Sequence, residues 1–151
     1  MIVRETACRG EIEKILLDPV IYDCISDDNC PSIEEFKAPI GKGYTYIGGY
    51  SNNQIFGVMI YHNKNGKTYC HIQVLPEYRA EFAQEFAKKA LDEQLQYGDE
   101  VWAEIPTCYD NVLRFALSFG FRQVDKQKDA YLKNGEKSDI IVLRYNHGLC
   151  S

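Results

Sequence analysis

Residues 70–91 read CHIQVLPEYRAEFAQEFAKKAL, and this stretch decides the predicted fold. Its first residues have the character of a buried strand, Pro76 ends that strand, and Arg79 begins a long amphipathic helix. A strand that runs into a helix N-terminus is suited to an anion, because unpaired backbone N–H groups and the helix dipole meet there. The sequence therefore predicts an anionic ligand at the corner formed by residues 74–79.

The composition indicates one soluble domain that spans residues 1–151. Hydrophobic residues make up 45% of the chain and charged residues 26%, which are ordinary shares for a globular protein. No apolar run approaches the ~20 residues that a membrane span needs, and the first residues do not form a secretory signal. We therefore expect a cytoplasmic protein with no membrane partner. The net charge of −5 argues against a nucleic-acid partner, because such domains present a basic face.

The cysteines do not suggest a disulfide framework or a metal centre. The chain has 6 of them, but no two form a C-x-x-C pair, and an unsecreted protein keeps its thiols reduced. No set of cysteines and histidines has the spacing of a zinc site, so no metal is predicted. Cys70 and Cys108 lie in apolar strand or strand-end contexts, where we expect them to pack as small buried hydrophobic groups.

Strand and helix patterns follow one another in the order β-α-α-β-β-β-α-β-α-β-β. The expected strands are residues 2–6, 43–50, 54–62, 67–75, 100–105, 121–132 and 138–145. The expected helices are residues 11–17, 20–25, 79–97 and 111–119. Asn-Gly pairs at 65–66 and 134–135 predict two tight hairpins, and Gly98 and Gly120 are expected to cap the two longer helices.

The long helix between two strands indicates a βαβ crossover, so parallel and antiparallel pairs occur in one sheet. The predicted fold class is therefore α+β (or α/β), with a mixed sheet of about seven strands and helices on both faces. Ligands of such sheets bind at the carboxyl ends of neighbouring strands. Here those ends are the corners at residues 74–79 and 105–111.

Several motifs in this order carry a resemblance to a known family. They are Val74-x-Pro76-x-x-Arg79, His71-x-x-x-Leu75-Pro76, Phe115-x-x-x-Phe119-Gly120-Phe121 and Asp18-Pro19-x-Ile21-Tyr22. Together they resemble the GNAT superfamily of acetyl-CoA-dependent N-acyltransferases, and within it a branch common in tailed-bacteriophage genomes. The resemblance covers nearly the whole chain.

The resemblance implies a splayed sheet that binds acetyl-CoA as a co-substrate. The pantetheine arm would pair with the strand backbone at Ile72, Gln73 and Val74. The pyrophosphate would lie against Arg79 and the N–H groups of the residues that follow it, which are Ala80, Glu81, Phe82, Ala83 and Gln84. Arg79 itself supports a phosphate partner, since a cation at a helix start opposes the dipole. Asn111 has a residue type that the family uses near the cofactor, although it could equally be a helix N-cap.

Three residues are candidates for the proton transfers of direct amine attack on the thioester. His71 suits a base, because its ordinary pKa is near 6.5; the alternative is a buried histidine bonded to a backbone carbonyl. Glu104 could take a proton through water, or it could be a solvated strand residue. Many members place a tyrosine donor where this chain has Ala116, and Tyr109 is the nearest phenol in sequence.

The leading prediction is an N-acetyltransferase that acts on the primary amine of a small molecule, a protein lysine or a protein N-terminus. Two glycines of the family's phosphate loop are replaced here by Phe82 and Gln84. A rival prediction is therefore a GNAT-fold binding protein that acts through protein contacts, and a third is a CoA sensor. A homodimer is compatible with the sequence, and a phage-encoded copy would act in the host cytoplasm.

Overall fold

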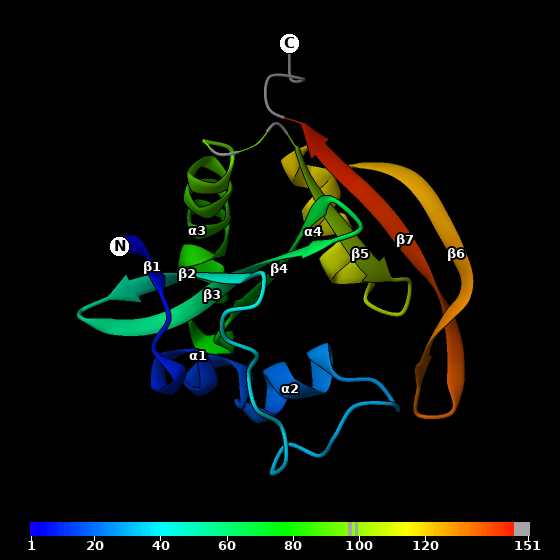
Figure 1. Cartoon of the computed structure of the whole chain (residues 1–151), viewed down its shortest axis with the longest axis horizontal. Helices are drawn as coiled ribbons and strands as arrows, with labels where there is room; N and C mark the ends of the chain where they lie inside the picture. The colour runs from blue at the N-terminus through cyan, green and yellow to red at the C-terminus, as the bar shows by residue number, and fades with distance from the viewer. Residues whose placement is uncertain (97, 99, 147–151) are drawn as a thin grey trace.

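The computed structural model describes residues 1–96, 98 and 100–146, and these form one mixed sheet flanked by helices (Figure 1). The strands lie in the order β1-β2-β3-β4-β5-β7-β6. Their bounds are β1 (Ile2–Thr6), β2 (Tyr44–Ser51), β3 (Gln54–Lys64), β4 (Lys67–Val74), β5 (Glu100–Pro106), β6 (Arg122–Lys133) and β7 (Glu136–Asn146). The helices are α1 (Arg9–Leu16), α2 (Pro19–Ile25), α3 (Arg79–Gln94) and α4 (Asp110–Phe119), with a 3₁₀ turn, η1, at Pro76–Tyr78. The predicted fold class and element order are confirmed.

The sheet divides between β4 and β5. All other neighbouring strands pair antiparallel over several residues, whereas β4 and β5 run parallel and meet only at Tyr69 and Trp102. Beyond that pair the two strands diverge, so the sheet is splayed as expected. The opening lies at the carboxyl ends of both strands.

Helices cover both faces of the sheet, and each face has its own core. On one face α3 packs against the sheet through Phe86, beside Phe56 and Leu143, and α4 adds partly buried side chains. On the other face α1 and α2 bury Ile15 and Ile21 against β2 and β3. Adjacent side chains of a strand point to opposite faces, which is why β3 contributes to both cores.

The two predicted hairpins form as the Asn-Gly pairs require. Asn65 and Asn134 have φ values of 54°, and the glycine that follows each has φ of 77°, the left-handed values of a tight two-residue turn. Gly120 caps α4 at φ 106°, also as predicted.

The predicted end of the long helix is wrong. α3 ends at Gln94 with Leu95 as its C-cap, so Gly98 does not cap it, and Tyr97 lies outside the described residues. The last buried residue of α3 is Leu91. Beyond it only Leu95 at the C-cap packs on the core, and it is partly buried. Little packing is therefore available to support a longer helix, and packing rather than propensity supports most helices.

The cysteine predictions are confirmed only in part. Cys70 is buried, but Cys108 is exposed, because it lies in the turn that follows the end of β5 at Pro106. Cys8, Cys24 and Cys30 are exposed and free, and Cys150 lies outside the described residues. Among the described residues, no helix is long and apolar enough to cross a membrane.

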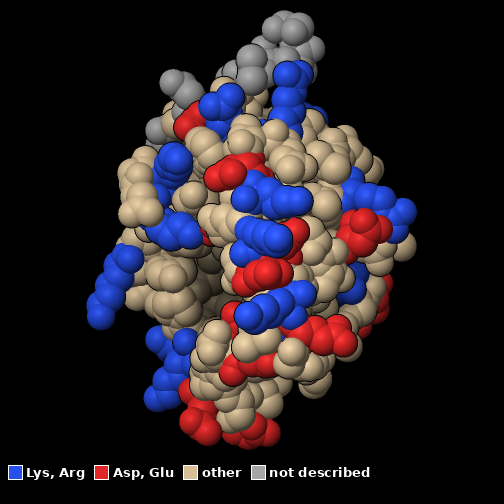
Figure 2. All heavy atoms as spheres, turned by 90° about the vertical axis from the view of Figure 1, so that its right-hand side faces the viewer, with Lys and Arg blue, Asp and Glu red and all other residues tan. Residues whose placement is uncertain are grey.

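The outer edge of the sheet carries charges of both signs. Figure 2 views the molecule from the side of β6 and β7, where basic and acidic side chains alternate along a row beside a hollow. The exposed charged residues of β6 are Arg122, Asp125, Lys126, Lys128 and Asp129. Two register shifts also interrupt its pairing with β7. Charges and bulges on an edge strand oppose pairing with another sheet edge.

Candidate functional site

The candidate site lies where β4 and β5 diverge, on the face opposite α3. On β4, Cys70 and Val74 point into the core under α3, so His71 between them points to the other face. On β5, Ala103 is in the same core, and Glu104 therefore also lies on the opposite face. The structure thus places the two predicted base candidates on one face, beside the opening.

Four side chains form what we call the polar cluster: His62 and Lys64 of β3, His71 of β4 and Glu104 of β5. The Nε2 atoms of the two histidines are 3.1 Å apart. Lys64 Nζ donates to Glu104 Oε1 at 2.5 Å, and Gln127 of β6 donates to Glu104 Oε2 at 3.4 Å. Glu104 is therefore an ion-paired residue rather than a freely solvated one.

Electrostatics keep both imidazoles neutral at pH 7. His71 is exposed to solvent, and its ring lies beside that of His62. Desolvation by the neighbouring protein atoms, followed by the proximity of His62, lowers the pKa of His71 to about 4, although the Glu104 charge acts to raise it. Burial and the Lys64 charge also lower the pKa of His62. His71 therefore carries a free lone pair under ordinary conditions.

The alternative of a buried, carbonyl-bonded histidine is wrong for His71. Its side chain is exposed to solvent, and its ring nitrogen contacts another imidazole instead of a backbone oxygen. A role for His71 as a base stays a prediction.

Part of the β4 backbone is left without a strand partner at the opening. The N–H of Leu75 donates to the carbonyl of Phe56 on β3 at 2.8 Å. Hydrogen-bonding direction alternates along an antiparallel strand, so Gln73 also faces β3 whereas Ile72 and Val74 face β5. The Val74 carbonyl accepts from Arg79 Nε at 2.9 Å. The peptide groups turned toward the opening are thus both groups of Ile72 and the N–H of Val74.

The strand-to-helix corner contains fewer available amides than the sequence predicts. The 3₁₀ turn η1 uses the N–H of Tyr78, which bonds to the Leu75 carbonyl, and the N–H of Arg79, which bonds to the Pro76 carbonyl. The amides from residue 82 onward lie beyond the first helical turn and bond within α3. The helix-start amides that remain are those of Ala80 and Glu81.

Phe82, which occupies a glycine position of the GNAT phosphate loop, turns its ring inward. The Phe82 ring stacks on Phe56, with ring centroids 4.9 Å apart and planes 20° apart, and it lies 6.1 Å from the Tyr78 ring. Phe82 and Ala83 are half-buried, whereas Gln84 is exposed. The ring of Phe82 therefore fills the core beneath α3 and does not stand over the helix start.

Tyr109 lies at the N-cap position of α4, and its hydroxyl is 2.9 Å from the hydroxyl of Tyr131 on β6. Tyr131 in turn contacts the Ser26 carbonyl at 3.2 Å. A carbonyl only accepts, so Tyr131 donates to Ser26 and Tyr109 donates to Tyr131. Burial raises the pKa of Tyr109. Its hydroxyl is engaged by Tyr131, and a role as thiolate donor stays a prediction.

Asn111 is exposed in the first turn of α4, where its Oδ1 accepts from Arg114 at 2.8 Å. The helix begins at Asp110, so the alternative that Asn111 is the N-cap is wrong. The structure brings Asn111 to the β5–α4 corner, as predicted, but gives it no contact with the polar cluster among the interactions of the described residues.

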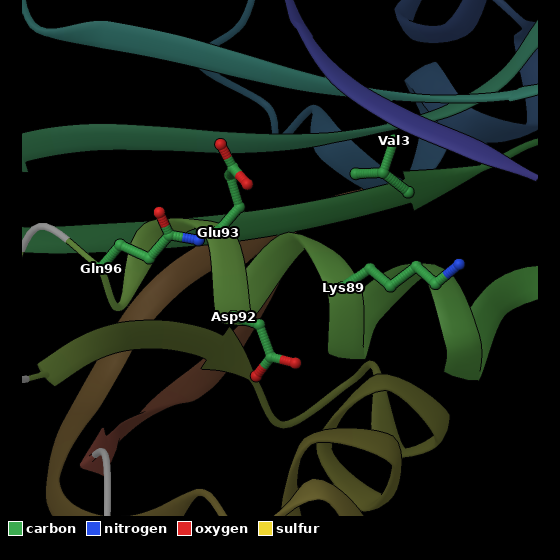
Figure 3. A pocket seen from close by; sticks show the side chains of 5 residues that line it. All are labelled: Val3, Lys89, Asp92, Glu93 and Gln96. Carbon is green, nitrogen blue, oxygen red and sulfur yellow. The ribbon is translucent and has the colours of Figure 1, made fainter.

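A separate hollow of about 320 Å³ lies between β1 and the last turns of α3, away from the polar cluster. Figure 3 shows that its charged side chains diverge: Glu93 points toward the sheet, while Asp92 and Lys89 point elsewhere. Side chains that do not converge on one point make a poor ligand site. The described residues also contain no group of three metal-binding side chains.

The site predicted from the sequence does not include His62 and Lys64, although the hairpin register of β3 on β4 could have indicated them. The turn at Asn65 and Gly66 fixes the register of β3 on β4, which pairs Lys64 with Lys67 and His62 with Tyr69. That register places His62 diagonally from His71 on the same face.

Comparison with known proteins gives a clear result for the fold. No model of a known protein family matches the sequence, and no curated protein matches it. Solved structures do match. A proposed acetyltransferase from Salmonella typhimurium, with its cofactor acetyl-CoA, is 16% identical with a TM-score of 0.74, covering 97% of this chain and 93% of that one.

Two further structures agree. A ribosomal-protein-alanine N-acetyltransferase from Brucella melitensis is 14% identical (TM-score 0.72; 97% of this chain, 99% of that one). A proposed acetyltransferase of the GNAT family from Desulfovibrio desulfuricans is 18% identical (TM-score 0.68; 96% and 98%). The chain therefore has the GNAT acetyltransferase fold. These structures are bacterial and do not support the tailed-phage branch.

Proposed function

We propose that this protein is an N-acetyltransferase that moves the acetyl group of acetyl-CoA to a primary amine. One observation carries the proposal: β4 and β5 meet at a single residue pair and then diverge, beside His71 and Glu104. The opening combines unpaired backbone groups with a neutral base, as direct transfer from a thioester to an amine requires.

The residues at the opening fit acetyl-CoA. The peptide groups of Ile72 and the N–H of Val74 can pair with the amides of a pantetheine arm. Each pantetheine amide has an N–H donor and a carbonyl acceptor, as a strand backbone does. The amides of Ala80 and Glu81 suit a pyrophosphate, as do the Nη groups of Arg79, which have no hydrogen-bond partner among the described residues. Bound acetyl-CoA would supply the activated acetyl group.

The chain's own residues then manage the protons. His71 accepts a proton as the amine nitrogen bonds to the thioester carbon and the carbon–sulfur bond breaks. Glu104 stabilises the imidazolium that forms. Tyr109 is the proposed donor to the leaving thiolate, and it must break its bond to Tyr131 to reach it.

The acceptor amine belongs to a small molecule or to a protein. The Brucella melitensis structure is named for a ribosomal-protein alanine, so a protein N-terminus is one candidate acceptor here. Candidate amines should therefore include peptides with free N-termini, free polyamines and lysine peptides.

Calorimetry with acetyl-CoA, followed by thiol-release assays with these amines, tests the proposal. We expect binding at micromolar concentrations, weakened in Arg79→Ala, and thiol release that is about 10²-fold slower in His71→Gln. An absence of binding at high micromolar acetyl-CoA would refute the proposed acetyltransferase function.

A second candidate is a GNAT-fold binding protein that acts through protein contacts. It is favoured by the corner, where η1 already uses the amides of Tyr78 and Arg79, and by the engaged proton of Tyr109. This candidate predicts no acetyl-CoA binding, so the same calorimetry separates the two.

A further inference from the structure

The two histidines of the polar cluster face each other edge to edge. Their ring planes differ by only 6°, the centroids are 5.2 Å apart, and the Nε2 atoms are 3.1 Å apart. Parallel rings with distant centroids and a short nitrogen–nitrogen contact share an in-plane hydrogen bond rather than a face-to-face stack.

This contact fixes opposite tautomers in the two rings. A neutral imidazole has one N–H and one lone pair, so one Nε2 must donate and the other must accept. Because Nε2 of His71 is occupied by His62, the nitrogen left for an acceptor amine is Nδ1. Nδ1 of His71 has a lone pair only if its Nε2 carries the hydrogen.

We propose that His62 is a positioning residue: its Nε2 accepts the Nε2–H of His71 and so keeps the His71 lone pair on Nδ1, available to the acceptor amine. This inference rests on the proposed function. When Nδ1 takes the amine proton, the bond to His62 becomes charge-assisted and strengthens.

The surroundings hold His62 in this position. Its ring lies against Tyr44 of β2, with centroids 5.4 Å apart and planes 22° apart, and against Tyr69 of β4 at 5.8 Å. The charged groups that face the pair are Lys64 and Glu104, which bond to each other. Glu104 favours a proton on either ring and Lys64 opposes it.

The direct test is the tautomeric state of each histidine in the full chain without ligand. Long-range ¹H–¹⁵N correlation spectra at pH 7 report it, with His62→Phe and His71→Gln used for assignment. We expect the Nε2–H tautomer for His71 and the Nδ1–H tautomer for His62. The reverse assignment would overturn the inference and leave the proposed function standing.

A matched pair of variants tests the consequence for turnover. His62→Phe keeps an aromatic ring between Tyr44 and Tyr69 but removes the acceptor, whereas His62→Gln places an amide oxygen near the former Nε2. We expect kcat to fall about tenfold in His62→Phe, the loss of one hydrogen bond to a charged group. His62→Gln should retain most of kcat, and KM for acetyl-CoA should change in neither.

The two failures are distinguishable. If acetyl-CoA does not bind to the wild-type protein, the proposed function fails while the tautomer spectra still decide the hydrogen bond. If the wild type is active and His62→Phe has the same kcat and the same pH profile, the inference fails.

Discussion

Replacing Phe82 by glycine introduces one of the glycines that the GNAT phosphate loop carries. The structure predicts that this variant has a lower free energy of unfolding and no tighter binding of acetyl-CoA. The ring is half-buried and stacks on Phe56 at 4.9 Å. Loss of half its burial costs about 1 kcal/mol. Loss of the aromatic pair costs about 1 kcal/mol, and glycine in a helix costs about 1 kcal/mol more.

The expected destabilisation of Phe82→Gly is thus about 3 kcal/mol. For a chain of this size the melting temperature should fall by about 6–12 °C. Gln84→Gly is the matched control, because Gln84 is exposed and loses only the helix term. Its melting temperature should fall by about 2–4 °C.

Thermal unfolding followed by circular dichroism, and calorimetry with acetyl-CoA, give the two readouts. Because the ring points into the core, its removal should not tighten acetyl-CoA binding by more than about threefold. Equal melting temperatures in the two variants would refute the packing argument. An affinity gain of tenfold or more in Phe82→Gly would show that the ring obstructs the ligand.

Three further predictions address the core, the hairpin and the base. In Gly49→Ala the new methyl group would lie 2.7 Å from the Phe56 ring and 2.9 Å from the Phe86 ring, so urea unfolding should show a loss of about 1–3 kcal/mol. Backbone N–H groups of Gly135 and Asn134 lower the pKa of Asp28, so its stabilisation is present at neutral pH and is lost as the pH falls through the lowered folded-state value. Denaturant midpoints of the wild type and Asp28→Ala should therefore differ at pH 7 and approach each other as the pH falls below the unfolded-state value of about 3.9. In His71→Gln, kcat should fall about 10²-fold with acetyl-CoA binding unchanged. In the wild type, His71 should stay neutral down to acidic pH, so kcat should decline only as the pH drops through about 4. A decline of kcat centred near the ordinary histidine pKa would contradict this.

Most of the fold could be predicted from local signals. The Asn-Gly pairs, the proline after β4 and the apolar stripe of α3 each specify backbone geometry within a few residues. The errors occur where tertiary contacts decide. α3 ends at Gln94 because only the partly buried Leu95 packs on the core beyond Leu91, and Cys108 is exposed in the turn that follows β5. The 3₁₀ turn η1 was not anticipated.

The site was harder to predict because it depends on contacts between strands. His71 and Glu104 could be selected from the sequence by their residue types and by their places on the two strands that lead to the predicted corners. The partners of those residues, His62 and Lys64, follow only from the exact register of β3 on β4. The direction of the Tyr109 proton depends on Ser26, which is distant in sequence and adjacent only in the fold.

The central claim is that the opening between β4 and β5 holds acetyl-CoA, and an amide NMR titration of the ¹⁵N-labelled chain tests it most directly. The account predicts that acetyl-CoA shifts the amide signals of Ile72, Val74, Ala80 and Glu81 most strongly. Shifts that cluster instead at the hollow around Lys89 and Glu93, or no shifts at millimolar acetyl-CoA, would contradict it.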